Sequence, residues 1–281
     1  MIGKLTVSTT ISLLLLFGIL VLVAVVPLLT GYDPYSQDLA SGLLPPGELS
    51  PEGRTYLLGS DALGRDVLSR LALAGRISLF IGFSAVLLSL VVGVFFGLIA
   101  GFFRGWIENV IMGIADLQLS IPRVLLLIAV AAILGTGVFK LAILLGLTSW
   151  VVYGRVSRAM ALSLREREFV LSATTQGATA AWNIRKHLLP HVAPQMLIVG
   201  SYELGQIIVL EASLSYLGLG VQPPLPSWGL MVSEGQTYLE LDPWLSVLPS
   251  ITLFMLVAGV QILSQSFTAE NDMSAEIARA Q

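Results

Sequence analysis

The chain of 281 residues has little charge and no cysteine. Only 12% of its residues are charged, about half of the ~25% found in soluble domains, and 55% are hydrophobic. The missing cysteine excludes disulfides, thiolate metal sites and a cysteine nucleophile. A net charge of −3 excludes a strongly basic nucleic-acid binder. We therefore expect an integral protein of the lipid bilayer with no nucleic-acid partner.

Lys and Arg are missing from one long stretch and concentrated in another. Residues 187–278 contain neither. Residues 151–190 contain six: Arg155, Arg158, Arg165, Arg167, Arg185 and Lys186. Because short cytoplasmic loops of membrane proteins are enriched in Lys and Arg, we expect this basic block to form a cytoplasmic loop.

Stretches long and apolar enough to cross a bilayer, which takes ~20 residues, occur six times. They are residues 11–29, 77–103, 109–134, 138–160, 192–210 and 245–267. The first exceeds the ~7–15-residue apolar core of a signal peptide, so we expect a retained helix. An even number of spans places both termini on one side, and the basic block makes that side cytoplasmic. The fold class expected is an all-α integral membrane protein with six transmembrane helices.

Motifs for catalysis and metal binding are absent. The sequence has no G-x-x-x-x-G-K-[ST], H-E-x-x-H or G-x-S-x-G, which are the signatures of a phosphate-binding loop, a zinc protease and a serine hydrolase. His187 and His191 are four residues apart, but Pro190 between them favours a helix start. We expect no catalytic residue and no metal site.

Three ionisable residues fall inside predicted spans, where charges usually have a function. Asp116 and Arg123 lie in the third span and Glu203 in the fifth. Asp116 and Arg123 share a helix face ~10 Å apart, and a direct pair would need a kink at Pro122. Alternatively, either could line a water-filled path or bind the basic loop. We take Asp116 and Arg123 as candidates for the translocation path.

The segment 164–190 has the spacing of a short helix, followed by a turn and by a return of the chain into the membrane. Phe169, Ala173 and Gly177 recur every four residues, so they share a helix face. Gly177 suits a helix end with positive φ, and Pro190 would open the fifth span. Two interpretations remain open from periodicity: a lever joining two spans, or a surface helix with arginines on lipid phosphates.

Small residues form a column in the second span. Ser89, Gly93, Gly97 and Gly101 are spaced by four, which lets another helix approach closely. We expect this column to pack within the fold, with a subunit contact as the alternative.

The segment 211–229 should bend and stiffen after the fifth span, because Gly218 and Gly220 weaken a helix and three prolines cannot continue one. Trp228 and Trp244 would suit a membrane interface. The segment could form a surface under a docked protein or a plug shaping the outer mouth. The candidate residues of this external segment are Glu211, Gly218, Gly220 and Trp228.

At four places the residues resemble one family. Glu168, Ala173, Gly177, Leu189 and Pro190 are similar to the EAA loop of permease subunits of binding-protein-dependent ABC importers. Three further stretches resemble the dipeptide, oligopeptide and nickel group, C-type subunit. They are 59–66 with Ser69, Arg70, Gly75, Arg76 and Ser78; Asp116 with Pro122; and 211–224 with 226–229.

The resemblance implies a type I ABC importer permease in a bacterial inner membrane. It implies four partners: a second homologous permease, two cytoplasmic ATPases and a solute-binding protein. ATP and Mg would bind the ATPases, so this chain would be non-catalytic and carry no cofactor. The substrate would be a peptide, with nickel or another metal complex as the alternative. A secondary transporter or an inert scaffold subunit is the rival class.

The resemblance also implies an organisation and a coupling loop. The organisation is an N-terminal helix in 1–30, an external segment in 31–76, a permease domain in 77–270 with a coupling loop in 161–190, and a cytoplasmic tail in 271–281. The coupling residues are Glu168, Phe169, Ala173, Thr174, Gly177, Leu189 and Pro190. The chain departs from the family at Thr174, where Ala is usual, at His191, where Asn is common, and in the tail, which lacks the family pattern.

Overall fold

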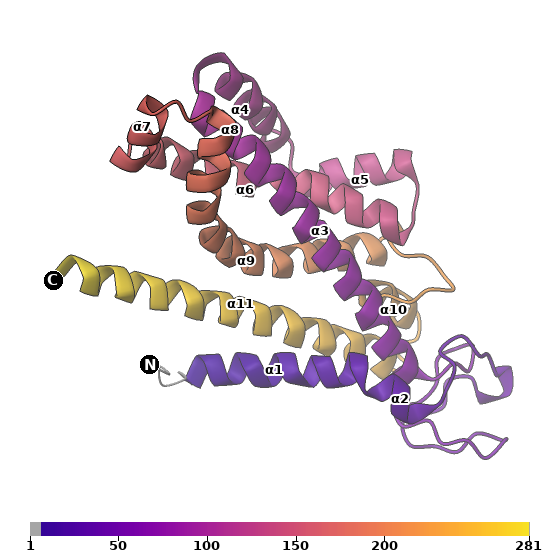
Figure 1. Cartoon of the computed structure of the whole chain (residues 1–281). Coiled ribbons are helices and arrows are strands. Elements are labelled where there is room, and N and C mark those ends of the chain that lie inside the picture. Colours follow the sequence, from indigo (N-terminus) through magenta and orange to yellow (C-terminus); the bar gives the residue numbers. More distant parts are fainter. Residues whose placement is uncertain (1–6, 281) are drawn as a thin grey trace. The chain divides into compact units, whose positions relative to one another are not determined.

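The computed structural model describes residues 7–280 and is helical in all its long elements (Figure 1). Residues 1–6 of the predicted first region and Gln281 of the predicted tail lie outside this range. Among the described residues, five helical segments are long and apolar enough to cross a membrane, and a sixth span results if one bent helix pair is counted. The five are Val7–Leu28, Val67–Phe103, Val138–Leu164, Ala180–Tyr216 and Trp244–Ser266. The expectation of an all-α protein with six spans is confirmed on that count.

The third predicted span is not a single straight helix. Helix α4 (Gly105–Leu119) and helix α5 (Arg123–Leu134) meet at a bend of 90°. Pro122 has no N–H to donate, and Ser120 ends α4 by donating its backbone N–H to the Asp116 and Leu117 carbonyls. The sequence pattern indicated a kink at Pro122 but not a broken span.

The fourth and fifth spans are longer than expected, which corrects two boundaries. Helix α6 (Val138–Leu164) extends beyond the predicted end near residue 160 and contains Arg155 and Arg158 of the basic block. Helix α8 (Ala180–Asn183), a π-helical turn η2 (Ile184–Leu188) and helix α9 (Leu189–Tyr216) follow without a gap. Pro190 therefore lies in the first turn of α9, as predicted. The chain does not break before Pro190, however, because the π-helical turn joins α8 to α9 as one continuous helical segment.

The described chain divides into two compact units, and each unit combines segments distant in sequence. The terminal unit comprises residues up to 82, 131–141 and from 205 onward. In it, helix α1 (Val7–Ala24) packs along helix α11 (Trp244–Ala280), and helix α10 (Trp228–Gln236) packs on α11 (Figure 1). Two short helices, α2 (Val26–Thr30) and η1 (Leu39–Ser41), precede helix α3 (Val67–Phe103), so the last ten residues of the predicted 31–76 segment are helical.

The central unit comprises residues 83–130 and 142–204 and is built on close contact between α3 and α6. A Cβ at Gly93 would lie 2.4 Å from the Trp150 carbonyl oxygen, and one at Gly97 2.4 Å from that of Gly154. Only residues without a side chain allow two backbones this close. The small-residue column therefore packs within the fold, as expected.

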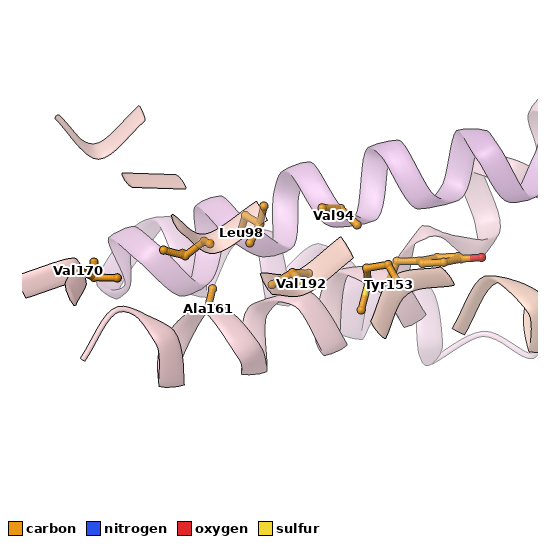
Figure 2. Packing of buried hydrophobic residues seen from close by; sticks show 8 residues of the cluster. Val94, Leu98, Tyr153, Ala161, Val170 and Val192 are labelled. Carbon is orange, nitrogen blue, oxygen red and sulfur yellow. The ribbon is translucent and has the colours of Figure 1, made fainter. Parts of the chain in front are cut away.

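The core of the central unit joins four helices. Val94 and Leu98 of α3, Tyr153 and Ala161 of α6 and Val192 of α9 form one buried cluster (Figure 2). Val170 belongs to the same cluster and comes from helix α7 (Glu168–Thr175). The short helix between the two spans is thus attached to the spanning helices by a buried side chain.

Candidate functional site

The loop between α6 and α8 is an exposed helix followed by a glycine turn. Helix α7 begins at Glu168, whose acidic side chain in the first turn suits the positive end of the helix dipole. Gly177 has φ of +90°, and a Cβ placed on it would meet no atom within 4 Å. The predicted helix end with positive φ is confirmed. The open space around Gly177 leaves this turn available to another molecule.

One face of the loop carries an aromatic cluster. The Phe169 ring lies 5.4 Å from the ring centroids of both His187 and His191, and it stacks on His191 at 19°. Trp182 packs edge-on against His187 at 5.0 Å. The two histidines thus serve ring packing here. Phe169, at 40% exposed, also presents surface outward.

A polar contact holds the two halves of the loop together, and sequence reasoning did not find it. The Thr174 hydroxyl donates to the Val170 carbonyl oxygen at 2.8 Å and accepts from the buried Asn183 amide at 3.0 Å. An alanine at position 174 could not make this contact. The only sequence signal for it was the expectation of alanine at this position from the family resemblance.

The remaining predicted coupling residues lie along the same region. Glu168 is exposed, Ala173 is half-buried, and Leu189 and Pro190 begin α9 with exposed side chains. Ala173 and Gly177 also line a shallow surface pocket with Trp182. The structure therefore gathers the predicted residues on one accessible part of the central unit.

Asp116 and Arg123 do not pair with each other. Arg123 lies 3.6 Å from a carboxylate oxygen of Glu203 and donates to the Ser149 hydroxyl. Asp116 pairs with Arg155 at 2.5 Å. Asp116 therefore binds a residue of the basic block, which was one of the two alternatives to a direct pair with Arg123. Glu203 is only 3% exposed. Its ion pair with Arg123 adds Glu203 to the functional candidates. The Glu203 oxygen that faces Arg123, Oε2, is too far for a hydrogen bond, and both it and Arg123 Nε are buried without a hydrogen-bond partner among the described residues.

The segment after the fifth span is packed more deeply than expected. Glu211 lies inside α9, fully buried, and accepts from Ser215 at 2.8 Å. Trp228 is 0% exposed and donates to the Leu71 carbonyl oxygen at 3.0 Å. The expected place of Trp228 at the membrane interface is therefore wrong, because its ring fills the space that Gly75 leaves open.

The glycines of that segment shape a turn and a close contact. Gly218 has φ of +75°, so it ends α9 in the left-handed region. A Cβ on Gly220 would lie 2.2 Å from the Ser215 hydroxyl. Further on, Asp242 accepts from the Trp244 backbone N–H at 3.3 Å, and burial raises the pKa of its carboxyl, which this bond partly offsets.

A charge cluster in the terminal unit was not singled out from the sequence as a site. Asp61 pairs with Arg65 at 2.6 Å and with Arg70 at 3.3 Å. Glu234 of α10 pairs with Arg70 at 3.0 Å and with Arg65 at 3.7 Å. The cluster ties the segment before α3 to α10. Residues 164 positions apart form its central pair, so no local pattern could have revealed it.

The arrangement defines a class of protein: a multi-pass helical membrane protein with an accessible helix-and-turn element between two long spans. The sequence profile described as "Binding-protein-dependent transport system inner membrane component" matches residues 93–269. The chain belongs to this family and is a permease subunit of a binding-protein-dependent ABC importer.

Two relatives and one solved structure illustrate the match. The di/tripeptide transport system permease protein DppC of Pseudomonas aeruginosa is 35% identical over 84% of this chain and 78% of its own length. The nickel transport system permease protein NikC of Escherichia coli is 34% identical over 84% and 83%. A chain of the methionine ABC transporter MetNI, in an inward-facing conformation, aligns with a TM-score of 0.54 at 18% identity over 69% of this chain and 93% of its own. The fold is that of a type I ABC importer permease.

Proposed function

We propose that this chain forms half of the path by which an ABC importer carries short peptides across a bacterial inner membrane. A second homologous permease forms the other half, two ATPases sit in the cytoplasm, and a solute-binding protein delivers the peptide outside. Both termini lie in the cytoplasm, on the side of the basic residues. The single observation that carries the proposal is the exposed α7–Gly177 element joining two spans of an importer permease.

The coupling mechanism follows from how α7 is attached. Val170 is buried in the core of α3, α6 and α9, while Glu168, Phe169 and Thr175 face outward. A partner that moves α7 therefore moves the spanning helices with it, because packed cores transmit displacement. When the ATPases close on ATP and Mg, they would draw α7 inward and switch the access of the path.

Peptides are the proposed substrate because of relatives such as the di/tripeptide permease. Nickel or a nickel complex is the second candidate, favoured by the similar identity to the nickel permease. The binding protein makes most of the selection in such a system. Affinity purification of the chain from its native membrane, followed by identification of the binding protein and its bound ligand, separates the two.

A reconstitution experiment tests the proposed division of labour. The purified chain alone should hydrolyse no ATP, because the sequence has no phosphate-binding loop. The full complex in proteoliposomes should hydrolyse ATP and accumulate peptide only when the binding protein is present. ATP turnover by the isolated chain, or uptake driven by an ion gradient without the ATPases, would contradict the proposal.

A further inference from the structure

The Asp61–Arg65–Arg70–Glu234 cluster borders a cavity of about 330 Å³ in the terminal unit. This volume lies at the small end of ligand pockets, which hold ~300–1,000 Å³. Apolar side chains of Leu63, Val67, Met231 and Leu245 line another part of it, and Thr237 and Tyr238 also border it. The cavity therefore combines a charged part with an apolar part, as a site for a small amphipathic ion requires.

The charges at the cavity are unevenly buried. The side chains of Arg65 and Arg70 are 8% and 2% exposed, whereas those of Asp61 and Glu234 are 14% and 34% exposed. Two guanidinium groups and one carboxylate thus lie inside, and the second carboxylate, Glu234, lies nearer the surface. The buried guanidinium groups need a compensating charge, and the exposed Glu234 is the carboxylate that another carboxylate can most readily replace.

Arg70 retains an unused donor. Its Nε and Nη2 face Asp61 and Glu234, while Nη1 is buried with no hydrogen-bond partner among the described residues. A buried donor without an acceptor costs free energy that an incoming acceptor restores. Guanidinium groups bind carboxylates with two parallel hydrogen bonds, and Glu234 holds its Arg partners through a single oxygen.

We infer that this cavity is a binding site for the C-terminal carboxylate of a short peptide, at which the ligand displaces Glu234 from Arg70. The apolar lining receives the side chain of the last residue of the peptide. The inference rests on the proposed function in one respect: the carboxylate is taken to belong to a peptide because peptides are the proposed substrate. The cavity belongs to the segment proposed to be external, where a peptide leaving the binding protein arrives.

Calorimetric titration of the intact complex in lipid nanodiscs, without the binding protein, tests the inference. The probes are the dipeptide Ala-Phe and the same dipeptide with an amidated C-terminus. The free acid should bind at least about tenfold more tightly, since a hydrogen-bonded charge pair is lost in the amide. Equal binding of acid and amide, or no binding of the acid at millimolar concentration, would overturn the inference.

Two variants distinguish a binding site from a structural ion cluster. Arg70→Gln should weaken binding of the acid to the level of the amide. Glu234→Gln should tighten binding of the acid about three- to tenfold, because it removes the competing carboxylate. A structural cluster predicts no gain for Glu234→Gln, and that result would refute the site even if Arg70→Gln fails to fold. Arg54→Gln and Glu240→Gln, outside the cavity, are the matched controls and should bind as the parent does.

The outcome separates this inference from the proposed function. A complex that imports peptides with ATP and the binding protein but shows no carboxylate-dependent binding at the cavity refutes the inference alone. A complex that imports no peptide in the reconstituted system refutes the proposed substrate instead.

Discussion

Gly177→Asp is expected to reduce peptide uptake on the order of 100-fold, because it places a carboxylate on the surface proposed to contact the ATPases. A charge forced into a packed interface costs several kcal/mol, and a tenfold change corresponds to about 1.4 kcal/mol. A Cβ at Gly177 would meet no neighbouring group within 4 Å, so the cost expected inside this chain is the backbone strain of a side chain at φ of +90°. Uptake into proteoliposomes and stimulation of ATP hydrolysis by the liganded binding protein are the measurements, and both should be lost.

Two further variants show what the loss depends on. Gly177→Asn adds a side chain of the same size without charge, and Asn tolerates positive φ, so it should retain much of the uptake. Gly105→Asp is the matched control elsewhere, because Gly105 has φ of +60° and equally open space but lies at the start of α4. Normal uptake by Gly177→Asp, or an equal loss with Gly105→Asp, would refute the coupling role.

Arg123→Ala should lower uptake about tenfold or more, because it removes a charge from the proposed path and leaves Glu203 without its cation. Glu203 is 3% exposed and lies 3.6 Å from Arg123. Breaking a fully buried ion pair typically costs ~3–5 kcal/mol, and the cost here should be smaller because the Arg123 side chain is 31% exposed. The single variant therefore combines an effect on stability with any effect on transport, and both the melting temperature of the complex and its uptake kinetics must be measured.

The double variant Arg123→Gln with Glu203→Gln separates the two effects. Replacing both charges by amides removes the uncompensated carboxylate and keeps hydrogen-bonding groups for the Ser149 hydroxyl. We expect its melting temperature to recover toward that of the parent while uptake stays low. Full recovery of uptake would show that Arg123 serves only to neutralise Glu203. Arg123 would then no longer be a candidate residue of the translocation path.

Local patterns in the sequence predicted the elements that depend on local physics. The six apolar stretches, the positive φ at Gly177 and the packing of Gly93 and Gly97 follow from hydropathy, backbone sterics and side-chain size. The family followed from motifs in four places. Each of these signals is contained in a short window, so no knowledge of distant contacts was needed.

Features that depend on distant partners were missed or misplaced. The sequence marked Arg123 and Glu203 as intramembrane charges but not as a pair, since they lie on different helices. Trp228 fits an interface and a core equally well by composition, and only its contact with Gly75 and Leu71 decides for the core. Pro122 indicated a kink, but a single proline in the sequence does not predict a bend as large as the observed 90°.

The orientation and the coupling contact, the central claim, can be tested by cross-linking single cysteines. The chain has no cysteine of its own, so each introduced thiol is unique. Thr175→Cys in α7 and Ser36→Cys in the 31–76 segment are both at exposed positions. In native membranes, a thiol-reactive cross-linker should join Cys at 175 to an ATPase subunit, and a membrane-impermeant reagent applied from outside should label only the Cys at 36. Labelling of position 175 from outside, or cross-linking of position 36 to an ATPase, would contradict the account.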